Sequence, residues 1–297
     1  MKKKRLLWIL SVVLVVELLA AVGILYYIGA AENAGTKGGL KAGGSRQVMA
    51  LAARMEREAG RQASGEGEAG EAGEEAEAAD DTEAVGNGLI VAIDPGHQGS
   101  HIDMSEQEEN GPGSGEMKAK ATGGTTGAYT GLPEYQLNLD VSLKVRDLLE
   151  ERGYQVVMAR EDNDTAISNK ERALLANEAG ADVCVRIHAN GSEDPSSQGA
   201  LCLVMSRDNP YVGQLYEESS RLAEAVLEAY CQATGFTDQG VVTNDTMTGL
   251  NWSEIPVMIL EMGFMTNEHD DTKMADAAFQ DKMAEGIAEG IDAYFGI

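Results

Sequence analysis

Two of the four histidines stand directly after short apolar runs. His97 follows Leu89–Ile93 on a Pro-Gly turn, and His188 follows Val183–Ile187. Because apolar runs of this length that are rich in β-branched residues are typical of buried strands, we expect both imidazoles at the carboxyl ends of strands. Open α/β sheets bind their ligands at that edge. The two histidines are therefore candidates for a shared site.

A carboxylate can join them, because Glu134 stands at the start of a segment with helical periodicity, Tyr135–Arg152. Two histidines and one carboxylate form a ligand set of catalytic zinc, whose fourth position is left for water. Taken singly, a histidine at a strand end is often only hydrogen-bonded, and a glutamate before a helix often only complements the helix dipole. Spacing alone leaves both interpretations open. His101 and His269 lie in polar, loop-like contexts, and we expect neither to be a ligand.

Glu261 is a fourth candidate, since it follows the apolar run Pro256–Leu260. An ionisable group after five apolar residues is not expected to be merely a solvated charge. Beside a metal it could act as general base for a water and as general acid for a departing amine. A fourth metal ligand, or a carboxylate that orients a histidine, is the alternative.

The elements that must position these residues follow from the hydrophobic pattern. Apolar runs alternate with segments in which apolar residues recur every three or four positions, and this alternation predicts an α/β fold. We expect a mainly parallel or mixed sheet, flanked by helices on both faces. The predicted strands are Leu89–Ile93, Tyr154–Ala159, Val183–Ile187, Leu201–Met205 and Val257–Leu260, and the predicted helices are Tyr135–Arg152, Asn169–Glu178, Tyr211–Thr234 and Thr272–Phe295.

Five motifs occur in order across about Leu89 to Phe295. They are Ile93-Asp-Pro-Gly-His97, Glu134 with Asn138 and Leu139, Arg172-Ala-x-x-Ala-Asn177, Ile187-His188-Ala-Asn190, and Pro256 followed by Glu261-x-Gly-Phe264-x-x-Asn267. Together they resemble the zinc-dependent N-acetylmuramoyl-L-alanine amidases of the LytC/AmiC-like type, the amidase type 3 family. The resemblance implies a Zn²⁺ cofactor on His97, Glu134 and His188, with Glu261 as the catalytic residue.

The resemblance also implies the reaction, which the residues alone do not indicate. A member of this family is a peptidoglycan hydrolase that uses zinc-activated water to cleave the amide bond between N-acetylmuramic acid and the L-alanine of the stem peptide. Two alternatives remain open. One is a zinc peptidase that cuts within the stem peptide, and the other is a non-catalytic, wall-binding scaffold.

The chain departs from the family pattern in two places. The segment from Gln98 to Pro133 is unusually long and rich in Gly, Thr and Glu, so we expect a loop over the site. Within it, Lys118 and Lys120 are candidate contacts for stem-peptide carboxylates. Arg186 stands where a small polar residue is expected, and it could point to the cleft or to solvent. Asn190 is a further candidate for a substrate contact. Arg172 is expected to be structural.

The first thirty residues predict a membrane anchor. Met1–Arg5 is basic, and the apolar run Leu6–Ile28 is long enough to cross a bilayer as a helix. The basic end orients the N-terminus to the cytoplasm, which places the remainder outside the membrane. The alternative is a signal peptide cleaved near Gly29–Ala31, which would leave a secreted protein.

Three regions follow from composition. Residues 1–30 form the basic stub and anchor, 31–87 a flexible, disordered acidic linker rich in Gly, Ala and Glu, and 88–297 the catalytic domain. A net charge of −26 argues against nucleic acid as a partner, because phosphate binding needs a basic face. The expected partners are peptidoglycan and, through residues 1–30, the membrane. No pattern indicates an oligomeric state.

Overall fold

The computed structural model describes residues 86–297 of the chain. The predicted anchor of residues 1–30 and the predicted linker up to residue 85 lie outside the described residues. Within 86–297, no helix combines the length and the apolar character that a membrane span needs.

The described residues build a six-stranded mixed sheet with the strand order β4-β1-β5-β8-β6-β7. Neighbouring strands are parallel except for β8 and β6, which pair antiparallel. The strands are β1 (Ile90–Pro95), β4 (Gln155–Met158), β5 (Val183–Asn190), β6 (Ala200–Val204), β7 (Asp238–Thr243) and β8 (Val257–Phe264). The carboxyl ends of β1, β5 and β8 therefore share one edge of the sheet.

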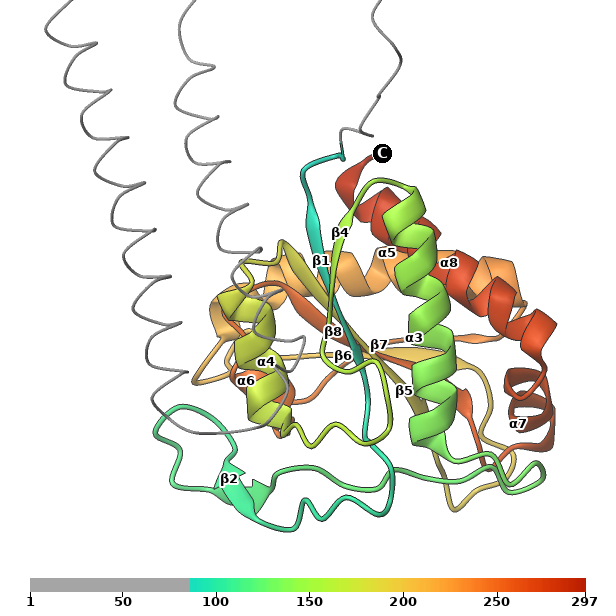
Figure 1. The fold of residues 1–297 in the computed structure, drawn as a ribbon, viewed down its shortest axis with the longest axis horizontal. Helices are drawn as coiled ribbons and strands as arrows, with labels where there is room; N and C mark the ends of the chain where they lie inside the picture. Colours follow the sequence, from blue (N-terminus) through green and yellow to red (C-terminus); the bar gives the residue numbers. More distant parts are fainter. Residues whose placement is uncertain (1–85) are drawn as a thin grey trace, which may run out of the picture. The chain divides into compact units, whose positions relative to one another are not determined.

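Helices cover both faces of this sheet, as the pattern predicts. Figure 1 shows α4 and α6 on one side and α3 and α8 on the other, and α8 also packs along α5. The helices are α3 (Glu134–Glu151), α4 (Asn169–Glu178), α5 (Tyr216–Thr234), α6 (Thr248–Asn251), α7 (Glu268–Met274) and α8 (Ala277–Phe295), with a 3₁₀ turn at Gly213–Leu215.

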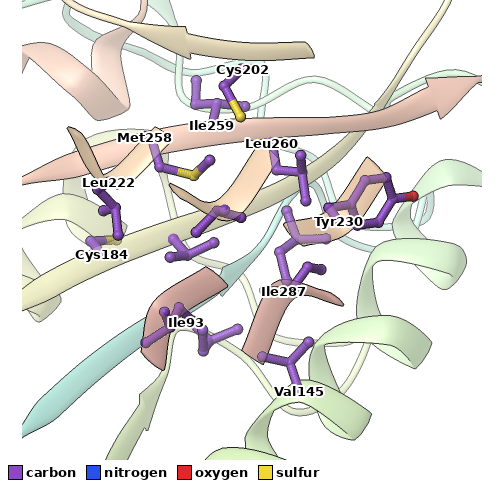
Figure 2. Close-up of a cluster of buried hydrophobic side chains, with 14 of the residues drawn as sticks. Ile93, Val145, Cys184, Cys202, Leu222, Tyr230, Met258, Ile259, Leu260 and Ile287 are labelled. Atoms are coloured by element: carbon purple, nitrogen blue, oxygen red, sulfur yellow. The ribbon is translucent and has the colours of Figure 1, made fainter. Parts of the chain in front are cut away.

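The core lies between the sheet and the helices, because the strands are apolar on both faces and each long helix on one. In α3 the apolar side chains at steps of three and four, such as Leu137, Val141 and Val145, are fully buried. Figure 2 shows Val145 and Ile287 of α8 against side chains of the sheet. This packing makes the sheet a rigid support for its carboxyl edge.

The structure differs from the predicted elements in several respects. The predicted helix Tyr211–Thr234 begins only at Tyr216, after the 3₁₀ turn, and α6 was not predicted. The strand β7 was not predicted, because the polar sequence Asp-Gln-Gly at its start hides the apolar run. The predicted helix Thr272–Phe295 is divided into α7 and α8. Asp276 causes the division, since its carboxylate accepts a hydrogen bond from Phe279 N at 2.8 Å and so starts a new helix.

The predicted loop between Gln98 and Pro133 contains a small antiparallel hairpin, β2 (Gln107–Glu109) and β3 (Met117–Ala119). It runs below the sheet in the view of Figure 1, on the side where α3 begins. The hairpin is tied to α4 and α6: Glu108 accepts from Lys170 N at 3.0 Å, and Trp252 Nε1 donates to Glu109 O at 2.8 Å.

Candidate metal centre

The structure brings the three predicted ligands to one edge of the sheet. His97 lies two residues beyond β1, Glu134 is the first residue of α3, and His188 lies in β5. One ligand atom from each lies within 4.8 Å of the others. The prediction that His188 follows its strand needs correction, because β5 continues to Asn190 through pairing with β8.

The donor atoms converge on one carboxylate oxygen. Oε1 of Glu134 lies 3.0 Å from Nε2 of His97 and 3.2 Å from Nδ1 of His188. The rings of the two histidines meet edge to face with centroids 4.8 Å apart. Glu134 is buried, whereas both histidine side chains are about one-seventh exposed, at 14% and 15%. The site is thus open to solvent from the histidine side.

The long loop after β1 orients two of the ligands through its backbone. Nδ1 of His97 lies 2.8 Å from the carbonyl oxygen of Thr122, and Thr125 N donates to Oε2 of Glu134 at 2.8 Å. A carbonyl oxygen only accepts, so Nδ1 of His97 donates to Thr122 O, and Nε2 faces Glu134. Nε2 of His97 and Oε1 of Glu134, 3.0 Å apart, hold either a proton or a metal cation between them. The donor set therefore fits a zinc ion.

The protonation states of the site agree with metal binding. Burial raises the pKa of Glu134, but hydrogen bonds from His188 and His97 outweigh it and hold that pKa well below its usual range. Burial lowers the pKa of His188 to about 4, although Glu134 opposes the change. At neutral pH the carboxylate is ionised and His188 is neutral, which are the forms that bind a metal.

Two glycines make room for the ligands. A Cβ atom on Gly96 would lie 2.2 Å from Cε1 of His188. Gly124 has a φ of +75°, and a Cβ there would lie 2.8 Å from Oε2 of Glu134. Any side chain at either position would displace a ligand.

Glu261 faces the same edge from β8, where it is the parallel register partner of His188. It too lies inside its strand, not beyond the strand's end as predicted, because β8 runs to Phe264. Burial, followed by the negative charge of Glu134, raises the pKa of Glu261 to about 8. A carboxyl group with such a pKa can both accept and return a proton near neutral pH.

The three candidate substrate contacts, Lys118, Lys120 and Asn190, each have a partner within the protein. Lys118 Nζ lies near Thr246 O, within hydrogen-bonding distance, and Lys120 pairs with Glu106 at 2.6 Å. Asn190 ends β5, and its side-chain oxygen accepts from Gly191 N at 2.8 Å.

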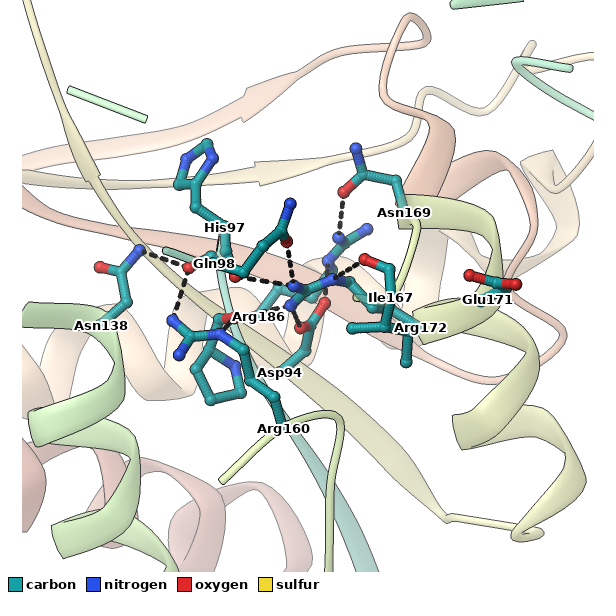
Figure 3. Close-up of polar contacts among 12 residues, drawn as sticks. Asp94, His97, Gln98, Asn138, Arg160, Ile167, Asn169, Glu171, Arg172 and Arg186 are labelled. Carbon is teal, nitrogen blue, oxygen red and sulfur yellow. Dashed lines mark hydrogen bonds and ion pairs between the residues drawn. The ribbon is translucent and has the colours of Figure 1, made fainter. Parts of the chain in front are cut away.

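Sequence reasoning missed a buried ionic cluster behind His97, although it had noted Arg172 as structural. Asp94 forms ion pairs with Arg172 and with Arg186, the latter at 2.8 Å. Figure 3 shows these groups beside Arg160 and the backbone of the His97 turn. Arg186 therefore points neither to the cleft nor to solvent. The only signal in the sequence was an arginine within an apolar strand.

Comparison with known proteins places this site in context. A family model described as N-acetylmuramoyl-L-alanine amidase matches residues 91–293. The chain is 30% identical over 213 residues to the N-acetylmuramoyl-L-alanine amidase LytC of Bacillus subtilis. This alignment covers 71% of this chain but only 40% of LytC. The chain is 27% identical over 216 residues to the N-acetylmuramoyl-L-alanine amidase Rv3717 of Mycobacterium tuberculosis, covering 70% of this chain and 86% of that one.

The described fold also matches solved structures. The crystal structure of the N-acetylmuramyl-L-alanine amidase Ami1 from Mycobacterium smegmatis aligns with a TM-score of 0.65 and 28% identity. The alignment covers 71% of this chain and 98% of that chain.

Proposed function

Because the chain belongs to the N-acetylmuramoyl-L-alanine amidase family over residues 91–293, we propose that it hydrolyses the amide bond between N-acetylmuramic acid and L-alanine in peptidoglycan. The observation that carries the proposal is the convergence of His97, Glu134 and His188, with Glu261 in register beside His188. The buried ionised carboxylate and the neutral histidine are suited to a divalent cation.

The proposed cofactor is zinc, held by His97, Glu134 and His188. When bound there, zinc polarises a carbonyl oxygen and lowers the pKa of a water toward 7. The protein's own part in the reaction falls to Glu261. Its carboxylate takes the proton from the attacking water and then returns that proton to the nitrogen of the departing L-alanine.

Fragment analysis of digested cell wall tests the proposal. Purified protein loaded with zinc is expected to release stem peptides that begin with L-alanine, and to leave free lactyl groups on the glycan, as read by mass spectrometry. Cleavage between residues of the stem would establish the zinc peptidase instead. Wall binding without any released fragment would establish the scaffold.

We further propose that residues 1–30 anchor the protein and that residues 31–87 link the anchor to the catalytic domain outside the membrane. The basic cluster ahead of the apolar run Leu6–Ile28 supports this orientation. A wall hydrolase must act on the outer side of the membrane, so the proposed location agrees with the proposed substrate.

A further inference from the structure

The turn that carries His97 has an unusual backbone. His97 has a φ of +62°, and among residues 86–297 it is the one non-glycine residue with a positive φ. Such a conformation is unfavourable for a residue with a side chain and persists only where the surroundings impose it. The conformation sets the direction in which the imidazole leaves the chain, so its cause bears on the metal centre.

Arg172 of α4 supplies part of that cause. It is 2% exposed, and all five of its N–H donors have partners. Two of the partners are backbone oxygens of the turn, Pro95 O at 2.6 Å and His97 O at 2.7 Å. A third is the side-chain oxygen of Gln98 at 2.9 Å. The guanidinium thus holds the turn on both sides of Gly96.

Arg160, which follows β4, binds the carbonyl oxygen of Gly96, which lies between the two carbonyls that Arg172 binds. It is also 2% exposed, and all five of its N–H donors are used. Its Nε donates to Pro95 O at 2.9 Å, and its Nη2 donates both to Gly96 O at 2.9 Å and to Tyr135 O at 2.7 Å. Tyr135 is next to Glu134, so one nitrogen atom joins the segments that carry two of the three ligands.

The cluster contains more buried guanidinium groups than buried carboxylates. Three buried arginines surround a single buried carboxylate, Asp94, which pairs with Arg172 and Arg186. Arg160 has no carboxylate among its hydrogen-bond acceptors, and most of its bonds end on backbone oxygens. Burying a guanidinium group is unfavourable unless its donors are satisfied, so these two arginines and the turn fix each other.

We propose that Arg160 and Arg172 are positioning residues for the metal centre, which together impose the left-handed conformation of His97 and the spacing between His97 and Glu134. The inference rests on the proposed function, because it assumes that His97, Glu134 and His188 bind zinc. It assigns the two arginines a role through the backbone, without contact to the metal or the substrate. Lysine keeps the charge but offers three donors on one atom, so it cannot hold three carbonyls apart.

The test measures Zn²⁺ affinity of the full chain by competition with a chromophoric chelator, together with the thermal midpoint of the zinc-free protein. We expect Arg172→Lys and Arg160→Lys each to bind Zn²⁺ at least ~10-fold more weakly than the natural chain, the range found for groups that orient ligands. The absorption bands of the Co²⁺-substituted variants are expected to shift, because the ligand geometry changes.

Arg186→Lys is the matched control. Arg186 is equally buried and shares Asp94, but its other bond goes to Asn169 and not to the turn. We expect this variant to lose a similar amount of thermal stability while its Zn²⁺ affinity stays within about twofold of the natural chain.

Three outcomes would overturn the inference. Natural Zn²⁺ affinity in folded Arg160→Lys and Arg172→Lys is the first, and an equal loss of affinity in Arg186→Lys is the second. Failure of both variants to fold is the third, since the arginines would then serve the fold and not the site. If the natural chain bound no Zn²⁺, or if His188→Ala bound Zn²⁺ as tightly as the natural chain, the proposed zinc site itself would fail instead.

Discussion

At the scale of single residues, the site is a set of groups whose charge states depend on one another. The hydrogen bonds that keep Glu134 ionised come from the two histidines, and the charge of Glu134 in turn raises the pKa of Glu261. Two carboxylates at one site thus take different protonation states near neutral pH. This difference separates a ligand from a proton carrier.

Glu261→Gln should retain zinc but lose turnover on purified cell wall by ~10²–10⁴-fold, the usual contribution of a general acid–base group. The amide keeps the shape of the side chain but cannot carry the proton. Zinc content by metal analysis and turbidity loss of the wall suspension measure the two effects. A variant that hydrolysed wall at close to the natural rate would show that the assigned role is wrong.

Glu261 should also make the zinc-free protein less stable as pH rises. Its pKa is about 8 in the folded state against 4.5 as the ordinary value, so between these pH values the folded state holds a proton that the unfolded state has released. Its contribution to the free energy of unfolding is therefore fully present below about pH 4.5 and lost as pH approaches 8. Above that pH the loss is complete.

The measurement is the difference in thermal midpoint between Glu261→Gln and the natural chain, both without zinc. We expect the thermal midpoint of the variant to rise relative to that of the natural chain as the pH is raised from 4.5 to 8. The rise should be at least about 2–4 °C, which corresponds to ~1 kcal/mol in a protein of this size. A difference that stays constant with pH would contradict the raised pKa.

At the scale of elements, the long segment after β1 combines two functions. Its last part, around Thr122 and Thr125, orients His97 and Glu134 through the backbone. Its first part, the β2–β3 hairpin, lies against α4 and α6 and carries Lys118. The two parts can be separated experimentally, because Lys120 N donates to Glu106 O at 2.8 Å and closes the base of the hairpin.

Replacing residues 107–119 by two glycines should therefore leave zinc binding intact, since Thr122 and Thr125 remain. If the hairpin shapes the substrate groove, turnover on cell wall should fall by about tenfold or more, equivalent to ~1.4 kcal/mol of transition-state binding. Lys118→Ala shows how much of the fall belongs to the amine that the replacement removes, and Lys120→Ala measures separately the amine that it leaves in place. Unchanged wall hydrolysis in the deletion variant would remove the hairpin from the substrate site.

The close packing of α5 and α8 gives a prediction about stability alone. A Cβ on Gly290 would lie 2.4 Å from Cα of Val226, and this neighbour is backbone that cannot move aside. Gly290→Ala should destabilise the fold by ~1–3 kcal/mol in chemical denaturation, despite the better helix propensity of alanine. Glu289→Ala, at the exposed neighbouring position, is the control and should change little.

At the scale of the whole molecule, the proposed anchor and linker decide where the enzyme meets its substrate. The full chain should sediment with membranes after cell disruption and should be degraded by protease added to intact, wall-free cells, because the proposed orientation puts the catalytic domain outside. Immunoblots of membrane, cytosol and medium measure this. A shortened protein found only in the medium would establish the cleaved signal peptide instead.

Much of this architecture was present in the sequence. The α/β class, the mixed sheet and the helices α3 and α4 followed from periodicity, because buried strands and one-sided helices leave different hydrophobic patterns. The two histidine ligands could be found because they stand beside apolar runs that end at a common sheet edge, and Glu134 because it starts a segment with helical periodicity. The family resemblance then supplied the reaction, which no spacing of residues could indicate.

The tertiary structure decided what no local pattern encodes. The polar strand β7, the split between α7 and α8 and the continuation of β5 past His188 depend on pairing and capping partners far along the chain or outside the hydrophobic pattern. The same holds for Arg160 and Arg172, whose acceptors are backbone oxygens up to 77 residues away. Such bonds involve atoms that every residue carries, so the sequence does not mark them. It determined which side chains could bind zinc, and the folded backbone determined their alignment.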